Sequence, residues 1–329
     1  MKNILTSLAI IILISSFNNS KADEKDKFLL KKIKSLGDIH SVQNTECDLC
    51  GCYFGIEPNY SLNSVGLRYS YFKFASDPVA VANPNVDHET SPTGDNEIYS
   101  KIELVAKYNV NQKLRLILTV PYKLNDINGS RIRDIGDVLL MGQYLVYSTE
   151  MSLKNESKYR QRVYLGGGVK APTGAFNKQL VYGVTEPHFQ PGTGAFDFLV
   201  SGTYFGKYKD FGFNADASYS MATTNKNEYR FANRLNMAAA IFYQIPVGET
   251  GVLPHTGVYY ESAGMDKQGD LEVDDSGGNV LFLTGGLDIY FSSFAFNLDY
   301  QYPLNNKLNG DQTENKFRVI TGLSYYFGM

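Results

Sequence analysis

Three thiols lie close together near the start of the chain, in the stretch TECDLCGCYFGIEPN. Cys47, Cys50 and Cys52 are the only cysteines among the 329 residues. Two of them could form a local disulfide, which would leave one thiol over for an intermolecular link or as a free group. Three soft thiolates could instead hold a copper(I) ion, whereas tetrahedral zinc would need a fourth ligand such as His40. The residue types leave a disulfide and a metal site open as alternatives.

The segment around these thiols follows a leader typical of exported proteins. In MKNILTSLAIIILISSFNNSKA a basic Lys2 precedes an apolar run, and Ser20 and Ala22 have the spacing of a cleavage site. We therefore predict a signal peptide at residues 1–22 and an exported mature chain, in a compartment where disulfides persist. Residues 23–58, with the thiols and one short amphipathic helix in DKFLLKKIKSL, are predicted to form a periplasmic tail or a plug.

The remaining residues, 59–329, have the composition of a β-protein. The chain contains 24 Tyr, 20 Phe and 30 Gly but no Trp, a mixture that favours strands and turns over helices. After the leader, no run reaches the roughly 18 to 20 apolar residues that a membrane-spanning helix needs. A formal net charge of -3 gives no electrostatic case for a nucleic-acid partner.

Long segments of the chain alternate between apolar and polar residues. In FGFNADASYSM, residues 211–221, every second side chain is apolar and those between are polar or glycine. The segment FAFNLDYQYPL, residues 294–304, repeats this pattern. Because successive side chains of a strand point to opposite faces of the sheet, each segment is predicted to be a strand with one apolar face. Twelve such strands are predicted at 62–74, 97–108, 113–123, 135–147, 160–171, 196–206, 211–221, 231–244, 252–261, 279–291, 294–304 and 316–327.

The apolar face of these strands carries no charge. None of its positions is Asp, Glu, Lys or Arg, although those residues make up 20% of the chain. A Lys or Arg that faces lipid at the bilayer midplane costs about 2–4 kcal/mol, which is a reason to exclude charge from every outward position. A soluble sandwich would tolerate charge on its outer face. The opposite face is predicted to line a lumen, and it carries Arg68, Glu103, Lys107, Arg115, Asp137, Arg162, Lys170, Asp197, Asp216, Arg234, Asp288, Asp299 and Arg318.

Most connections between the predicted strands are alternately long and short, from 75–96 and 109–112 through to 292–293 and 305–315, and the connection 148–159 fits this pattern least. Outer-membrane barrels have short periplasmic turns, longer outer loops and an even number of strands. The sequence therefore predicts an all-β fold, a transmembrane antiparallel β-barrel of about 12 strands with a short N-terminal extension. Its predicted location is the outer membrane of a Gram-negative bacterium, where aromatic side chains near the strand ends would contact lipid.

Three segments of the barrel region resemble a known family. They are IGDVLLMGQYLVYS, YLGGGVKAPTGAFN and QPGTGAFDFLVSGTYFGKYKDFGFNADASY. They are similar to a family of bacterial outer-membrane barrel transporters named for the meta-pathway of phenol degradation, over about residues 60 to 327. The N-terminal CDLCGC and the later TTNKNEYRFANR look like a subgroup from Bacteroidetes-type bacteria. The resemblance rests on Gly136 and Asp137 entering one strand, Lys170, Pro172, Thr173 and Gly174 closing the next, and Gly192, Gly194 and Asp197 opening the one after.

The predicted lumen is narrow. Barrels of 16 to 18 strands leave an aqueous channel, and twelve strands leave less room. Several large apolar residues are predicted to point inward and to fill part of the space, which disfavours free diffusion of large solutes. They are Phe72, Leu139, Met141, Phe205, Phe242, Phe282 and Tyr326.

The chain is accordingly predicted to be an outer-membrane channel or transporter for a small solute, with hydrophobic or aromatic compounds as one class. A metal-handling protein that binds copper at the thiols is the first alternative, and an outer-membrane enzyme or a structural barrel is the second. His88 and His188 are expected to be solvated loop residues, and His255 to face inward; none lies in a nucleophile motif. We therefore predict no enzymatic activity and no cofactor apart from that metal ion. The barrel-assembly machinery is an expected partner.

Overall fold

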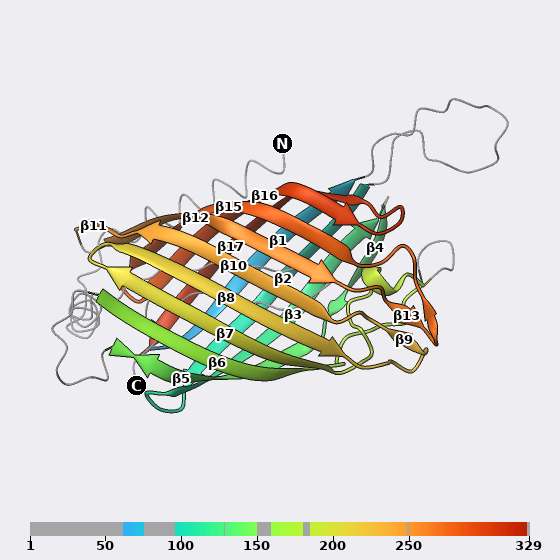
Figure 1. Ribbon diagram of the computed structural model, residues 1–329, viewed down its shortest axis with the longest axis horizontal. Helices are drawn as coiled ribbons and strands as arrows, with labels where there is room; N and C mark the ends of the chain where they lie inside the picture. Colours follow the sequence, from blue (N-terminus) through green and yellow to red (C-terminus); the bar gives the residue numbers. More distant parts are fainter. Residues whose placement is uncertain are drawn as a thin grey trace, which may run out of the picture.

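The strands of the protein form one closed antiparallel barrel of 12 strands, seen from the side in Figure 1. The computed structural model describes residues 62–75, 96–127, 129–149, 159–179, 185–248 and 250–327. The predicted strand number and antiparallel arrangement are therefore confirmed. The barrel strands are β1 (Asn63–Ala75), β2 (Asn96–Asn109), β3 (Leu114–Ile127), β5 (Val138–Ser148), β6 (Tyr159–Ala171), β7 (Asp197–Tyr208), β8 (Phe211–Ala222), β10 (Arg234–Tyr243), β12 (Thr250–Ala263), β15 (Gly278–Phe291), β16 (Phe294–Leu308) and β17 (Glu314–Phe327).

Closure joins the first barrel strand to the last. Each strand pairs with its neighbours in sequence, and β1 also pairs with β17 in a register that sets Arg68 opposite Gly322. A closed sheet has no row of unpaired backbone groups, which is the condition for a sheet to cross a membrane. No helix in the described part of the chain is long and apolar enough to do so.

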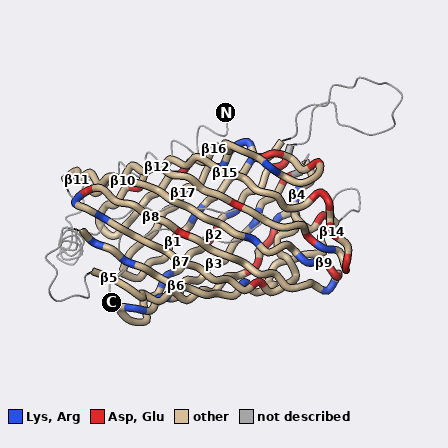
Figure 2. Tube along the Cα trace, in the orientation of Figure 1, with Lys and Arg blue, Asp and Glu red and all other residues tan. Residues whose placement is uncertain are grey.

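The two ends of the barrel differ in their connections. At the turn end, strands are joined by short turns such as 209–210 and 292–293, and the small strand β11 (Ile245–Val247) lies there. At the loop end, longer connections carry β4 (Ser130–Ile135), the 3-10 helix η2 (Pro187–Phe189), β9 (Tyr229–Arg230), β13 (Lys267–Gln268) and β14 (Leu271–Glu272). Figure 1 shows β11 at one end and β4, β9 and β13 at the other. In Figure 2 charged residues gather at the loop end.

The strands separate an apolar outer face from a mixed inner face, as the alternation predicts. Large apolar side chains such as Leu67, Leu165 and Leu304 are exposed on the outside, where lipid would cover them. The register departs from strict alternation at a bulge between Leu145 and Tyr147. The predicted strand 231–244 begins too early. Its first residue, Phe231, was predicted to lie on the apolar outer face but is only 6% exposed, because β10 begins at Arg234 and Phe231 belongs to the loop before it.

Two apolar clusters fill the interior near the two ends. The turn-end cluster consists of Leu62, which directly precedes β1, and of Phe205, Phe242, Leu253, Tyr290, Ala295 and Tyr326, which lie on strands close to the short turns. The loop-end cluster consists of Phe72, Phe74, Tyr99, Ile132, Phe189 and Ile320. All seven large apolar residues predicted to point inward are buried, which agrees with a narrow lumen.

Candidate functional site

The candidate functional site is the barrel interior together with the loop that crosses its loop end. The structure places the residues that were predicted to line the lumen on the inner side of the wall. All of them are buried except Asp216, which is half-buried. Asp137 is a special case, because it precedes β5 and its carboxylate contacts a loop rather than the lumen wall.

Ion pairs join neighbouring strands of the inner wall. Arg68 on β1 and Glu103 on β2 are register partners, and Arg68 Nε donates to Glu103 Oε2 at 2.7 Å. Lys101 Nζ lies 3.6 Å from the other oxygen of Glu103. Removing one partner of such a buried pair leaves an uncompensated charge and typically costs about 3–5 kcal/mol. The charged side chains of the inner wall therefore stabilise the barrel and also make its interior polar.

Arg318 on β17 lies at the centre of a second group. Its guanidinium donates to both carboxylate oxygens of Glu261 on β12, at 2.7 and 3.1 Å. The same guanidinium lies 4.9 Å from the ring centroid of Phe72 and 4.1 Å from that of Phe282. A buried planar cation is held here by a bidentate carboxylate and by two aromatic faces. Arg318 thus links strands that are not neighbours, β12 and β17, across the interior.

His255 on β12 reaches over a neighbouring strand to Asp299 on β16. His255, Gly286 and Asp299 are register partners on β12, β15 and β16, and His255 Nε2 lies 2.7 Å from Asp299 Oδ1. A side chain at position 286 would overlap the imidazole, so the glycine makes this contact possible. Asp288 Oδ2 lies 3.5 Å from the other ring nitrogen. The imidazole, predicted to face inward, is thus placed between two carboxylates.

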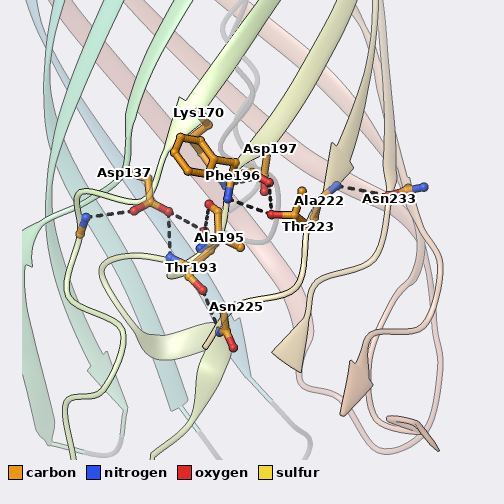
Figure 3. A network of polar contacts seen from close by, with 11 residues as sticks. Asp137, Lys170, Thr193, Ala195, Phe196, Asp197, Ala222, Thr223, Asn225 and Asn233 are labelled. Atoms are coloured by element: carbon orange, nitrogen blue, oxygen red, sulfur yellow. Dashed lines mark hydrogen bonds and ion pairs between the residues drawn. The ribbon is translucent and has the colours of Figure 1, made fainter. Parts of the chain in front are cut away.

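Residues that carry the family resemblance, before β5, at the end of β6 and before β7, meet at one point on the rim. Figure 3 shows Asp137, Lys170 and Asp197 there. One carboxylate oxygen of Asp137 accepts from Gly174 N at 3.0 Å, and the other accepts from Thr193 N at 2.8 Å and Thr193 Oγ1 at 2.7 Å. Lys170 and Asp197 form an ion pair beside it. We call Asp137, Thr173, Gly174, Gly192 and Thr193 the rim clasp.

The glycines of the rim clasp are required by close backbone approach. A Cβ at Gly192 would overlap the carbonyl group of Gly174, and one at Gly174 would lie against Gly136. Thr173 completes the contact, because its hydroxyl donates to Gly136 O and accepts from Val138 N, both at 3.0 Å. The spacing of these residues in the sequence is therefore explained by a structural task, which is to fasten the β6–β7 loop to the start of β5.

The fastened loop places the segment 185–191 across the mouth of the barrel. Phe189 is 0% exposed and belongs to the loop-end cluster, where it makes an edge contact with Tyr99 at 5.9 Å between ring centroids. Asn125 Nδ2 donates to Phe189 O at 3.0 Å. Gln190 is tied to the backbone of Lys178 by two hydrogen bonds of 2.8 Å. We call 185–191 the mouth segment.

One prediction about this loop is wrong. His188 was expected to be a solvated loop residue, but its side chain is only 16% exposed and its Nε2 lies 2.8 Å from Asp266 Oδ2. The contact partners come from connections far away in the sequence, after β12 and before β10. Sequence alternation carries no signal for such loop-to-loop contacts, and an Asp followed by Lys in a polar loop is not distinctive.

The cysteine prediction lies outside the described residues, as do the signal peptide 1–22, the segment 23–58, His40 and His88. A disulfide or a metal ion at Cys47, Cys50 and Cys52 therefore remains a prediction. Within the described part of the chain, no group of three or more His, Cys, Asp or Glu side chains is arranged to hold a metal ion.

Comparison with known proteins identifies relatives by fold and not by sequence. No family model matches the chain. No curated protein matches it either. The structure is similar to the COG4313 outer membrane channel from Pseudomonas putida F1, with 13% identity, a TM-score of 0.57, and 81% of this chain and 96% of that chain covered. It also matches the beta domain of the Bordetella autotransporter BrkA, with 11% identity, a TM-score of 0.45, and 81% and 100% covered.

The comparisons correct one prediction and leave another as it was. The prediction that the chain is not an enzyme is wrong as an exclusion, because the barrel fold does not by itself decide between a channel and an enzyme. The similar structures include LpxR from Salmonella typhimurium, with 10% identity, a TM-score of 0.38, and 80% of this chain and 100% of that chain covered. A barrel of this kind is compatible with more than one activity. The resemblance to the phenol meta-pathway family stays a prediction, whereas the outer-membrane barrel fold is shared with the P. putida channel.

Proposed function

We propose that the chain is a gated outer-membrane channel for a small solute. The observation that carries the proposal is the mouth segment, which packs the fully buried Phe189 into the loop-end cluster and is fastened to the rim through Asp137. The inner wall beneath it is lined by polar and charged side chains. A polar wall and a constriction are the two parts that a selective channel needs. The shared fold with an outer membrane channel supports the same conclusion.

The constriction would have to move for a solute to pass. Phe189 packs into an apolar cluster at the loop end, and Phe205 and Phe242 stack at 5.7 Å between ring centroids at the turn end. Strand-borne residues such as Phe242 are held by the barrel wall, whereas the mouth segment is held by a loop. The proposed gate is therefore the mouth segment, because lids and gates are drawn from elements whose local stability is low.

The proposal includes export and membrane insertion. A cleaved leader at 1–22 would direct the chain across the inner membrane, and the barrel-assembly machinery would insert residues 59–329 into the outer membrane. The short turns would then face the periplasm and the mouth segment the outside, as in other barrels of this kind. The solute class follows only from the family resemblance, which points to hydrophobic or aromatic compounds.

Conductance of the folded protein in a planar lipid bilayer tests the proposal. Asp137→Asn removes the charge that holds the rim clasp. Asp134→Asn is a matched control, because Asp134 lies three residues before Asp137 and forms an exposed ion pair with Lys178. We expect infrequent openings for the native protein and the control, and more frequent or longer openings for Asp137→Asn. If the native protein, Asp137→Asn and Phe189→Ala are all folded barrels and all remain silent, the chain is not a channel.

A further inference from the structure

Three connections of the loop end converge on one buried carboxylate, that of Asp266. Asp266 lies in the connection between β12 and β15, and its side chain is 1% exposed. His188 comes from the β6–β7 loop, and Tyr229 and Ala232 come from the connection between β8 and β10. The carboxylate therefore joins parts of the chain that are far apart in sequence, and it lies outside the rim clasp.

The contacts of Asp266 occupy both of its oxygens. Tyr229 Oη donates to Asp266 Oδ2 at 2.6 Å, and His188 Nε2 lies 2.8 Å from the same oxygen. Ala232 N donates to Asp266 Oδ1 at 2.7 Å. The backbone of Asp266 is fixed as well, because its N–H donates to Ser276 Oγ at 2.8 Å. Hydrogen bonds to a buried charge are among the stronger ones in proteins, so this arrangement holds the three connections firmly.

Aromatic side chains shield the carboxylate from water on the His188 side. The His188 ring makes edge contacts with Phe231 and Tyr229, at 5.4 and 6.4 Å between ring centroids. Tyr229 and Phe231 also contact each other at 5.0 Å and form a small cluster with Ala222. Shielding of this kind strengthens the electrostatic contact between His188 and Asp266, because water no longer screens it.

His188 precedes Phe189, the residue that closes the mouth. The rim clasp holds the mouth segment at its C-terminal side, through Thr193 next to the start of β5. Asp266 holds it through His188, at the connection that leaves β12. In the circular strand order β12, which ends three residues before Asp266, lies five strands from β5. The mouth segment is thus attached at two separate points of the rim.

We propose that Asp266 is a positioning residue of the gate, a second anchor that keeps the mouth segment across the barrel by holding His188. This inference rests on the proposed channel function and adds to it the residue that controls opening at the β12 side of the rim. Opening then requires release of His188 from Asp266, with the rim clasp serving as the hinge. The Tyr229 hydroxyl and the Ala232 amide keep the carboxylate in place when His188 leaves.

Two variants with a matched control test the second anchor. Asp266→Asn removes the charge that holds His188, and His188→Phe keeps an aromatic ring against Phe231 but has no Nε2 to donate. Asp270→Asn is the control, because Asp270 lies in the same connection and is exposed. Heat-modifiable migration on a gel checks that each variant is a folded barrel. The variant His188→Phe keeps the test decisive if Asp266→Asn fails to fold.

The first measurement is amide hydrogen exchange of the mouth segment in the folded full-length protein. The amides of Phe189 and Gln190 donate to Glu186 O and Pro187 O, so their exchange reports opening of the segment. We expect exchange at these two amides to rise by about tenfold or more in Asp266→Asn and His188→Phe, and to be unchanged in Asp270→Asn. Unchanged exchange in both test variants would overturn the inference.

The second measurement separates this inference from the channel proposal. In a planar bilayer, Asp266→Asn and His188→Phe should open more often than Asp270→Asn. A residue with a purely structural role would not change the opening frequency. Faster exchange in barrels that never conduct would support the anchor and reject the channel. Openings that are equally frequent in all three variants, with unchanged exchange, would support the channel and reject the anchor.

Discussion

The two ends of the barrel are closed by different means. At the turn end the closing side chains sit on the strands themselves, as with Phe205 on β7 and Phe242 on β10. At the loop end Phe189 is carried into the interior by a loop, which the carboxylates of Asp137 and Asp266 hold at two points. Closure built into the wall is as stable as the barrel, whereas closure by a tethered loop can be released locally. In the proposed channel, the loop end is therefore the end that would regulate passage.

The largest expected effect is loss of stability at the turn end. Phe242→Ala removes a fully buried ring that stacks on Phe205, and such truncations typically cost about 3–5 kcal/mol. Thermal or urea unfolding in detergent should show this loss, while exchange at the Phe189 amide stays as in the native protein. Phe211→Ala, on the exposed outer face, is the control and should change stability far less. If Phe242→Ala also speeds amide exchange at Phe189, the two ends are not independent and the distinction between them fails.

A smaller effect is the loss, at low pH, of the stabilisation that Asp266, the second anchor, gives to the folded loops. Burial raises the pKa of Asp266, but the hydrogen bond from His188 and the charges of His188 and Arg234 outweigh burial and lower the pKa to about 2, from an ordinary value of 3.8. Because the pKa is depressed in the folded state, the carboxylate stabilises the folded loops above pH 4. That stabilisation, about 2 kcal/mol, is lost as the pH falls through about 2.

We call the difference in the free energy of unfolding between the native protein and a variant the stability gap. The stability gap of Asp266→Asn measures this effect. The gap should be constant from pH 7 to pH 5 and should close between about pH 4 and pH 2, while the gap for Phe242→Ala at the turn end stays open. If the Asp266→Asn gap already closes above pH 5, another group carries the stabilisation.

A Cβ in the rim clasp should have an effect of about 1–3 kcal/mol. Gly192→Ala would force the backbones at Gly192 and Gly174 apart, and overpacking of this kind usually costs that much. We expect faster exchange at the Thr193 amide and more frequent openings in a bilayer, with the turn end unaffected. Gly248→Ala tests the turn end, where an added Cβ meets no neighbour within 4 Å and only the positive φ of 59° is unfavourable. Equal openings for both variants would contradict the assigned role of the rim clasp.

The smallest expected effect is at the exposed ion pair between Lys178 and Asp134. Both side chains are accessible to water, and surface pairs contribute little because solvent and salt screen them. Asp134→Asn should therefore leave unfolding and conductance within experimental error at physiological salt. A clear increase in the frequency of channel opening would mean that β4 also holds the mouth segment, as a third anchor at the loop end.

The wall of the barrel could be predicted from the sequence. Strict alternation of apolar and polar residues fixes which side chains face lipid, and the absence of charge on one face distinguishes a membrane barrel from a soluble sandwich. The positions of Arg68, Asp299 and Arg318 on the inner face follow from the same two-residue period. The two-residue period does not predict which inner side chains contact each other, such as Arg318 and Glu261 across the interior.

The loop end could be predicted only in part. The rim-clasp residues Asp137, Gly174 and Gly192 stood out in the sequence, but their meeting point depends on how two loops fold. Phe231 and His188 were assigned wrongly, to the outer face and to solvent, because their burial comes from loop contacts that have no sequence period. The strands β4, β9, β13 and β14 were missed for the same reason, since short loop strands lack the alternation that marks a crossing strand.

The pairing of β1 with β17 has a consequence for the order of events during assembly. The register that sets Asn63 opposite Phe327 joins residues from opposite ends of the barrel sequence, so this contact has the largest chain separation in the sheet. Closing such a long loop is slow, and until it closes both edge strands expose unpaired backbone groups that can pair with other chains. The seam between β1 and β17 is therefore the place where an assembly factor would need to shield the nascent barrel, and its closure would be the committing step of folding.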